Sequence, residues 1–429
     1  MSKKTILNLA LTDSGGAGKA ALLFNEMFNK YGFESLLVVQ SSNEKNKNVI
    51  VLPEKAKNIF SIHIILKKFK SLFLHLLLIK KYYFYNHVER KKVISAKEIL
   101  KVIPFVPDVI VLHWITGFVN TELIHDLEKI TKAKFFWIMM DNAPLTGGCH
   151  FPWNCVGFES SCSNCPAIKL SMFKKLAYDN LEFKKKLIPK SLILLSCSTT
   201  DYLRAKQASV FKENQIDKIL LPVDSDKFSI GDRSLAKKHF SIGLSQKVIF
   251  CGATDVLNIR KGFKYFLEAI LIFERTLKLN NISLDTYVIL LAGNIDPNFL
   301  LNIEIPLVIV GTLDEKNLIM AYQSAEVFVS TSIEDSGPLM INQSIMCGTP
   351  VVSFNIGVAV DLVRNNVTGY SSEIHNSNLL ADNIYKILSI NELYYLNMRK
   401  KCREIALNEF SYNSCFLTFN KLINNSSTI

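Results

Sequence analysis

Two neighbouring carboxylates, Glu334 and Asp335, open the stretch EDSGPLMINQSIMCGTPVV (334–352). The run AEVFVSTS (325–332) before them is typical of a buried strand, and the apolar run after the Gly-Pro step has the length of a helix. A carboxylate at this place lies among the free backbone N–H groups that begin a helix. It can bind sugar hydroxyls while the helix end binds a phosphate. The stretch therefore predicts a site for a sugar phosphate.

Two cations, Arg260 and Lys261, precede a glycine that opens a predicted helix over 262–277. Cations at a helix N-terminus oppose the helix dipole, and a bound diphosphate would remove that cost. We therefore expect both side chains to bind phosphate groups. The alternative is a solvated basic turn.

A glycine-rich segment, DSGGAGKAA (13–21), leads into another predicted helix. It does not match the Walker phosphate-loop pattern, because Asp13 and Ala20 occupy positions that need glycine and serine or threonine. Gly15 and Gly16 would still let a ligand approach the backbone at a helix end that favours an anion. The alternative is a plain turn between a strand and a helix.

Two further polar residues, His113 and Asp141, come at the ends of predicted strands 107–114 and 133–140. Ligands of open α/β sheets bind at the carboxyl ends of the strands. His113 is therefore either a ligand contact or a buried core histidine. Asp141 either binds an acceptor hydroxyl or caps the turn.

Nine cysteines are present, and four of them cluster at Cys149, Cys155, Cys162 and Cys165, next to His150. Four cysteines in so short a segment could hold a structural zinc ion, form two disulfides or stay as free thiols. The other five are scattered and are typical of core or loop thiols in a reduced compartment. No cofactor is expected to be required, apart from this possible zinc.

The formal net charge is +12, and the basic residues are concentrated in a segment that we expect to form a basic, apolar helix over 63–92. Apolar residues flanked by lysines suit the surface of an anionic membrane, and the alternative is a half-buried helix with a basic edge. No nucleic-acid-binding motif accompanies the charge. Neither a signal peptide nor an apolar run of membrane-spanning length is expected, so we predict a cytoplasmic protein, peripheral at the inner face of the cell membrane.

Strand and helix patterns alternate along the chain, which predicts an α/β fold with parallel sheets. In the first half we expect strands at 5–11, 34–40, 107–114, 133–140 and 191–197 and a helix at 18–32. In the second half we expect strands at 247–253, 286–294, 306–311, 325–332 and 349–354 and helices at 262–277 and 391–423. The polar segment LPVDSDKFSIGDR (221–233) between them is typical of a hinge.

These motifs together resemble the retaining glycosyltransferases of family four, the glycosyl transferases group one, which have the GT-B fold. The matching positions are Glu334, Gly348, Thr349, Pro350, Val351, Gly357, Asp361, Thr368 and Gly369, with support from VLHW (111–114), TGGCH (146–150), Lys261-Gly262 and VGTL (310–313). The resemblance implies two Rossmann-like domains whose parallel sheets face a central cleft. It implies an acceptor-binding domain at 1–222, with the cysteine cluster at 149–165, a nucleotide-sugar-binding domain at 223–405, and a C-terminal helix at 406–429 that returns to the first domain.

The resemblance also implies the roles of individual residues. Glu334, Lys261, Arg260 and His113 would be catalytic; Gly15, Gly16, Gly311, Thr312, Asp335, Ser336, Gly337, Pro338, Asn342 and Gln343 would bind the donor; and Asp141 would face the acceptor. The chain departs from the family at two places. The second glutamate, which holds the donor ribose, falls on Asn342 or Gln343, whose amide can still bond to a ribose. The histidine that family members place before the aspartate is Met140 here.

The reaction implied is retaining transfer of a hexose from a UDP- or GDP-sugar to a lipid-linked or glycan acceptor of a bacterial surface polysaccharide, such as lipopolysaccharide, O-antigen or capsule. The leaving diphosphate would accept the acceptor proton while Arg260 and Lys261 stabilise its charge. No catalytic metal is expected, because the one Asp-x-Asp sequence, at 224–226, lies in the hinge. The alternatives are a non-catalytic glycan- or nucleotide-binding subunit and a GT-B phosphorylase or epimerase.

Overall fold

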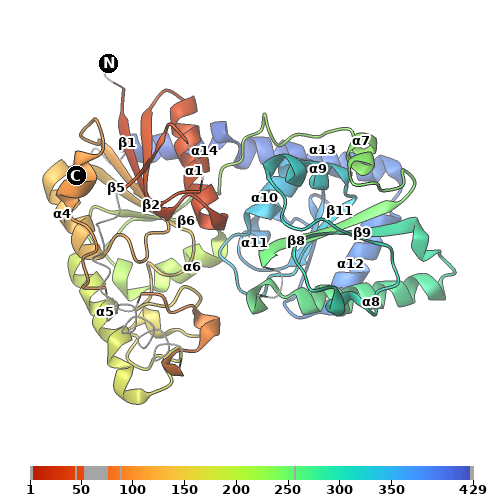
Figure 1. Ribbon diagram of the computed structural model, residues 1–429, viewed down its shortest axis with the longest axis horizontal. Helices are drawn as coiled ribbons and strands as arrows, with labels where there is room; N and C mark the ends of the chain where they lie inside the picture. Colours follow the sequence, from red (N-terminus) through yellow and green to blue (C-terminus); the bar gives the residue numbers. More distant parts are fainter. Residues whose placement is uncertain (1–2, 44–45, 53–75, 87–88, 256–257, 426–429) are drawn as a thin grey trace, which may run out of the picture. The chain divides into compact units, whose positions relative to one another are not determined.

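The chain folds into two compact units, each built on its own parallel sheet (Figure 1). The computed structural model describes residues 3–43, 46–52, 76–86, 89–255 and 258–425. The first unit comprises residues 1–197, 201–219 and 421–429, and the second comprises 198–200 and 220–420.

The first unit contains a seven-stranded sheet in the order β3-β2-β1-β4-β5-β6-β7, with every described pairing parallel. Its strands are β1 (Thr5–Thr12), β2 (Glu34–Ser41), β3 (Val49–Val51), β4 (Val109–Leu112), β5 (Lys134–Met139), β6 (Ile193–Ser196) and β7 (Ile216–Lys218). Its helices are α1 (Gly15–Lys30), α3 (Ala96–Lys101), α4 (Thr121–Thr131), α5 (Lys175–Leu187) and α6 (Thr199–Gln207), which starts in the second unit. The central strands are almost wholly apolar and buried, as expected for a parallel sheet covered on both faces.

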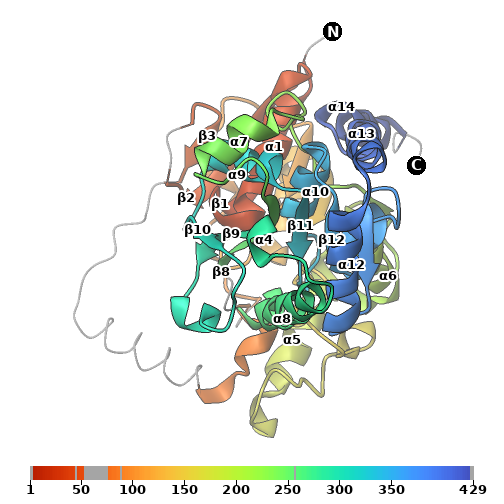
Figure 2. The ribbon, with the colours of Figure 1, turned by 90° about the vertical axis from the view of Figure 1, so that its right-hand side faces the viewer.

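The second unit contains a six-stranded parallel sheet in the order β10-β9-β8-β11-β12-β13. Its strands are β8 (Lys247–Asp255), β9 (Tyr287–Asn294), β10 (Leu307–Ile309), β11 (Val327–Ser330), β12 (Val351–Phe354) and β13 (Gly369–Ser372). Its helices are α7 (Arg233–His239), α8 (Phe263–Leu279), α9 (Glu315–Ser324), α10 (Leu339–Met346), α11 (Ala359–Leu362), α12 (Ser377–Ser389) and α13 (Glu392–Glu409). Helices α8 and α12 pack together on one face of the sheet, whereas α9, α10 and α13 cover the other (Figures 1 and 2).

The α/β prediction with two parallel, Rossmann-like sheets is confirmed, and every strand predicted from the sequence is present. Three short strands, β3, β7 and β13, were not predicted, because β3 is partly exposed and β7 and β13 consist mainly of polar or small residues, so β7 and β13 are not apolar runs and β3 is not buried.

The single C-terminal helix predicted at 391–423 is wrong in one respect, because the structure has two helices there. Helix α13 ends at Glu409, and α14 (Tyr412–Asn425) follows. Between them the Phe410 carbonyl accepts a hydrogen bond from the Val223 N–H at 3.0 Å, and Ser411 pairs with Val223. The Val223 N–H therefore takes the Phe410 carbonyl that would have continued the helix.

The basic, apolar helix predicted over 63–92 falls partly on residues 53–75 and 87–88, which lie outside the described residues. Over 78–86 the helix prediction is wrong. Leu78 and Phe84 form antiparallel bridges with Ile168 and Cys149, and a short 3-10 helix spans Lys80–Tyr82. Tyr82 and Phe84 are part of the core of the first unit, and Leu78 packs against it, whereas Lys80 and Lys81 are exposed. No helix among the described residues is long and apolar enough to cross a membrane.

His113 lies in the core where β1 meets β4. Its Nε2 is 3.1 Å from Asn8 Oδ1, and its ring contacts Phe24. Burial lowers the pKa of His113 from 6.5 to about 3, so this side chain is neutral in the folded protein at ordinary pH.

The stability of the first unit should therefore depend on pH through His113. Between pH 6.5 and 5 the unfolded chain protonates this histidine and the folded chain does not, so unfolding takes up a proton and stability falls as the pH falls. Wild type should lose about 2 kcal/mol more than His113→Gln over this interval. Urea unfolding followed by tryptophan fluorescence measures it, because Trp114, Trp137 and Trp153 all lie in the first unit. Parallel pH profiles for the two proteins would contradict it.

Gly262 shows how closely two loops approach each other in the second unit. Its φ is +61°, and a Cβ placed there would lie 2.1 Å from the Thr331 carbonyl oxygen at the end of β11. Gly311 has nearly the same φ, +63°, but among the described atoms nothing lies within 4 Å of its ideal Cβ. A comparison of substitutions at the two glycines therefore distinguishes the cost of a positive φ from the cost of the close contact with Thr331.

Gly262→Ala should destabilise the second unit by at least about 2 kcal/mol more than Gly311→Ala, which carries only the strain of a left-handed alanine. The measurement is urea unfolding followed by circular dichroism, with tryptophan fluorescence reporting the first unit as an internal control. Equal losses in the two variants would show that the approach to Thr331 does not require glycine.

Candidate functional site

The acidic loop of the second unit joins β11 to α10 and holds both predicted carboxylates in a buried position. Glu334 is 3% exposed and Asp335 8%. Gly262 approaches the loop from one side, and Gly357 approaches it from another. A Cβ on Gly357, whose φ is +54°, would lie 2.7 Å from the Asp335 carbonyl oxygen. The path of the loop therefore depends on two glycines from other segments.

Asp335 brings the predicted acidic and basic residues together. Its Oδ2 lies 2.6 Å from Lys261 Nζ and 3.5 Å from Arg260 Nη1. The same Arg260 nitrogen donates to the Glu334 carbonyl oxygen at 3.1 Å. Two main-chain contacts reinforce the contact between the loops: the Ile333 N–H donates to the Arg260 carbonyl at 2.7 Å, and the Thr331 hydroxyl donates to the Lys261 carbonyl at 3.0 Å.

The charge of Asp335 is set by two opposing effects. Burial alone would raise the pKa of its carboxyl, but the charges of Lys261 and Arg260 outweigh burial and hold the pKa below its ordinary value. Hydrogen bonds from Lys261 and from the Gly337 N–H act in the same direction. The carboxylate is therefore ionised, and it keeps both cations in place next to the loop.

Helix α10 begins at Leu339, four residues after Asp335. Its first turn receives no side-chain cap from Pro338, the residue before it in the described chain. Backbone N–H groups at such a terminus are the groups that bind phosphate oxygens. Ser336 is buried, whereas Gly337 and Pro338 are partly exposed at the start of the helix.

Asn342 and Gln343, the two candidates for the ribose contact, both lie on α10. Asn342 is fully buried, and its Nδ2 donates to the Leu221 carbonyl in the hinge at 3.1 Å. Gln343 accepts a hydrogen bond from the buried Tyr322 hydroxyl at 3.3 Å. Both amides thus have structural contacts, and a ribose contact stays a prediction for each.

The remaining donor residues lie elsewhere. Gly311 and Thr312 follow β10, where the Gly311 carbonyl accepts from the Gly293 N–H at 2.7 Å. Gly15 and Gly16 begin α1 in the first unit, with open space around the ideal Cβ of each among the described atoms. They belong to a different unit from Asp335, as does the interior His113.

Asp141 follows β5 in the first unit, and it has a histidine partner that the sequence did not predict. His150 Nδ1 lies 2.6 Å from Asp141 Oδ2, and the Trp114 indole N–H donates to the same oxygen at 2.7 Å. Met140 had suggested that this strand end lacks a histidine. The structure supplies one from the TGGCH segment, nine residues beyond the aspartate and next to the cysteine cluster.

The four clustered cysteines line one pocket of the first unit, together with Tyr82 and Phe84. All nine cysteines of the chain are free thiols in the structure. The Gly157 N–H is directed at Cys155 Sγ at 3.4 Å. Across the described residues, no three His, Cys, Asp or Glu side chains are grouped closely enough to hold a metal ion.

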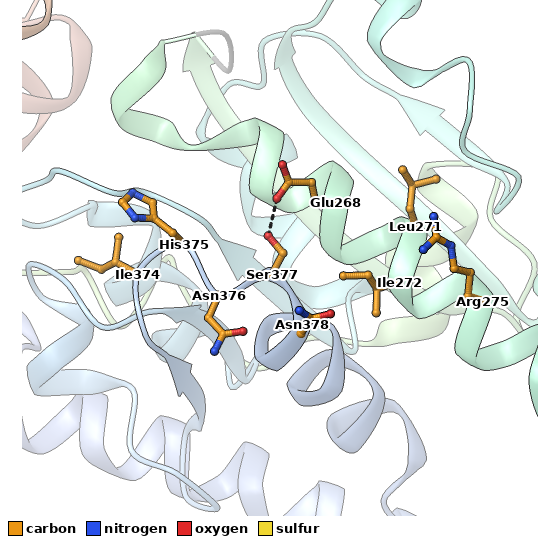
Figure 3. A pocket seen from close by; sticks show the side chains of 9 residues that line it. All are labelled: Glu268, Leu271, Ile272, Arg275, Ile374, His375, Asn376, Ser377 and Asn378. Carbon is orange, nitrogen blue, oxygen red and sulfur yellow. Dashed lines mark hydrogen bonds between the residues drawn. The ribbon is translucent and has the colours of Figure 1, made fainter.

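A large cavity, of about 570 Å³, lies in the second unit between α8 and the start of α12 (Figure 3). Its lining is mostly polar, and Ser377 donates to Glu268 across it at 2.7 Å. None of the predicted site residues lines it. Although this cavity is large, it is not the candidate site. The candidate site is identified by the charged residues beside α10.

Comparison with known protein families gives a match to most of the second unit. Residues 236–408 match the family model of the glycosyl transferases group 1. A search of curated proteins found no match.

Three solved structures resemble the whole chain. A glycosyltransferase from Rickettsia africae is 18% identical with a TM-score of 0.64, over 100% of each chain. Anabaena Alr3699/HepE in complex with UDP-glucose is 12% identical with a TM-score of 0.62, over 98% of this chain and 99% of that one. WaaG, a glycosyltransferase involved in lipopolysaccharide biosynthesis, is 13% identical with a TM-score of 0.61, over 98% and 99%. The chain therefore has the GT-B fold, and residues 236–408 form a glycosyl transferases group 1 domain.

Proposed function

We propose that this protein is a retaining hexosyltransferase that uses a UDP- or GDP-sugar. The observation that carries the proposal is the contact of Lys261 and Arg260 with Asp335 beside the start of α10, inside the matched domain. Two cations and a helix N-terminus are suited to a diphosphate, and the adjacent Glu334 would bind sugar hydroxyls. The Anabaena protein, which has the same fold, has been solved in complex with UDP-glucose, and this supports a nucleotide sugar as donor.

In the proposed reaction the bond between the sugar and the diphosphate breaks as the acceptor oxygen attacks from the same face of the sugar. The acceptor proton passes to the leaving diphosphate, so no protein nucleophile is required. Lys261 and Arg260 stabilise the negative charge that develops on the diphosphate. Retention of configuration follows from attack on that face.

The acceptor that we propose is a lipid-linked or growing glycan of a bacterial surface polysaccharide. The fold shared with WaaG, whose role is in lipopolysaccharide biosynthesis, supports this choice. A non-catalytic subunit would bind the nucleotide but would not hydrolyse a nucleotide sugar in the absence of acceptor. Hydrolysis assays across a panel of UDP- and GDP-hexoses therefore test for catalysis.

Nucleotide binding should depend on the two cations. Lys261→Ala should weaken the affinity for UDP or GDP by about tenfold or more, because a charge-assisted hydrogen bond contributes about 1.5–3 kcal/mol. Arg260→Ala should act in the same direction. Lys264→Ala is the matched control, since this exposed lysine lies three residues further on, in the first turn of α8, against Tyr265. Nucleotide affinity is measured by calorimetry. If Lys261→Ala and Arg260→Ala bind the nucleotide as tightly as Lys264→Ala does, the two residues belong to a solvated basic turn.

We also propose that the cysteine cluster binds structural zinc. Its four thiols share one pocket, and zinc would have to draw the sulfurs closer together than they lie here. Protein purified without chelator should contain about one zinc per chain by elemental analysis, and Cys162→Ser should lose it. If no zinc is found and nine thiols titrate in denaturant, the cysteines are free thiols. If fewer than nine thiols titrate, the cluster forms disulfides.

Peripheral membrane binding through residues 67–92 is a third proposal, and it rests on their composition. Charge reversal to glutamate at Lys67, Lys68, Lys70, Lys80 and Lys81 should abolish flotation with anionic vesicles, at about 1 kcal/mol per basic residue. The control is the same change of charge at exposed lysines elsewhere, at Lys186, Lys206, Lys212, Lys238 and Lys400. Equal flotation of the two variants and of wild type would contradict the proposal.

A further inference from the structure

Three basic side chains of the second unit lie around one carboxylate, at the end of β11 opposite to the acidic loop. Glu326 directly precedes β11 and is 8% exposed. Its Oε1 lies 3.0 Å from Lys237 Nζ and 3.4 Å from Arg233 Nη1, and both of these residues belong to α7. The third cation, Arg399, belongs to α13. We call Arg233, Lys237, Arg399 and Glu326 the basic cluster.

Arg233 uses two of its three guanidinium nitrogens. Nη1 contacts Glu326, and Nη2 donates to the Tyr395 hydroxyl at 2.7 Å, which in turn donates to the Glu326 carbonyl oxygen at 2.9 Å. The guanidinium carbon lies 4.8 Å from the centre of the Tyr395 ring. The third nitrogen, Nε, is buried and has no hydrogen-bond partner in the part of the chain that the structure describes.

Arg399 leaves one nitrogen unused in the same way. The residue is 9% exposed, and its Nε donates to the Gly348 carbonyl at 3.3 Å, whereas its buried Nη2 has no partner among the described residues. Burial lowers the pKa of Arg399, and the charge of Arg233 lowers it further, so the two guanidinium groups lie within range of each other's charge. Arginine still stays protonated in a protein, so Arg233 Nε and Arg399 Nη2 are both N–H donors.

Positive charge exceeds negative charge in the basic cluster. The other hydrogen bonds of Lys237 go to main-chain carbonyls, those of Gln246 at 2.6 Å and Leu244 at 3.5 Å. Over the described ranges of the chain, Glu326 is the one carboxylate that forms ion pairs with these three cations. Carbonyl groups supply dipoles but no charge, so two positive charges are left without a counter-ion.

A small anion would remove both deficits of the basic cluster. A buried donor without an acceptor and a buried charge without a counter-charge each cost free energy. A water molecule could accept from the two N–H groups, but it carries no charge and has two hydrogens that need acceptors of their own. Because both nitrogens are buried, the anion must give up its hydration shell. A monovalent halide loses less hydration than a phosphate or sulfate, since the cost of removing an ion from water grows with its charge.

We propose that the second unit binds one chloride-like monovalent anion between Arg233 and Arg399, held by Arg233 Nε–H and Arg399 Nη2–H. The anion joins α7 to α13 beside the Glu326 carboxylate. It binds only the folded state, since the unfolded chain does not bring the two arginines together. The inference does not depend on the proposed sugar transfer, because none of the predicted donor or acceptor residues belongs to the basic cluster.

The test in solution is the stability of the second unit at increasing chloride, with sodium gluconate exchanged for sodium chloride so that the ionic strength stays constant. Urea unfolding is followed by circular dichroism, and tryptophan fluorescence reports the first unit separately. Arg399→Gln removes the Nη2 donor and its charge. The matched control, Arg275→Gln, makes the same change at an exposed arginine on α8 in the same unit.

Release of one anion on unfolding should make the unfolding equilibrium constant of wild type fall about tenfold for each tenfold rise in chloride above the dissociation constant. Arg275→Gln should show the same dependence, and Arg399→Gln should lose it. General effects of the two salts on the protein surface are common to all three proteins, so they do not produce this difference. No chloride dependence in wild type, or an equal dependence in Arg399→Gln, overturns the proposal.

Should Arg399→Gln fail to fold, wild type provides the second measurement. Crystals grown in sodium bromide, with diffraction data collected at the bromine absorption edge, should give an anomalous peak within hydrogen-bonding distance of Arg233 Nε and Arg399 Nη2. A water molecule at this position, without anomalous signal, overturns the proposal. A peak in the crystal without chloride dependence in solution also overturns it, because the ion is then an adventitious ion only.

Discussion

The second unit depends on one buried electrostatic contact, in which Asp335 holds Lys261 and Arg260 against the end of β11. The carboxylate comes from the loop after β11 and both cations come from the segment after β8, so the contact also determines how these two loops meet. The glycine at 262 is required because this contact brings the main chain of one loop against the carbonyl of the other. Breaking a buried pair leaves an uncompensated charge, which costs more than the pair itself contributes. Fold and candidate chemistry therefore share the same residues.

The first unit uses a different arrangement at the corresponding edge of its sheet. Its pair, Asp141 and His150, is fixed by the indole N–H of Trp114 and the main-chain N–H of Ala143. The two edges thus differ in charge and in hydrogen-bonding groups. Cations beside a helix end suit an anion, whereas the edge of the first unit offers a carboxylate and an imidazole.

The sequence predicted both sheets, since their central buried strands are mostly continuous apolar runs. The resemblance to the glycosyltransferase family implied that Glu334, Asp335, Arg260 and Lys261 belong to one donor site. The sequence could not predict that the Asp335 carboxylate meets the cations, since this depends on the path of a loop between two glycines. His150 was missed for the same reason: only tertiary structure brings it to Asp141. The apolar residues at 77–84 were assigned to a helix because periodicity does not distinguish a membrane-facing surface from an irregular segment packed in the core.

The ion pair at Asp335 has opposing consequences for ligand binding. Lysine and arginine side chains lose considerable conformational entropy when a ligand orders them, and a pair that already holds them reduces this cost. The same carboxylate competes with a diphosphate for the cations, because one oxygen of Asp335 accepts from both. A diphosphate that engages Lys261 and Arg260 must therefore either share them with Asp335 or displace it. Sharing is the favourable outcome, since a displaced Asp335 would be a buried carboxylate next to a doubly charged ligand. The geometry of the loop thus favours a ligand that approaches the outer nitrogens of both cations and leaves the bond between Lys261 and Asp335 intact.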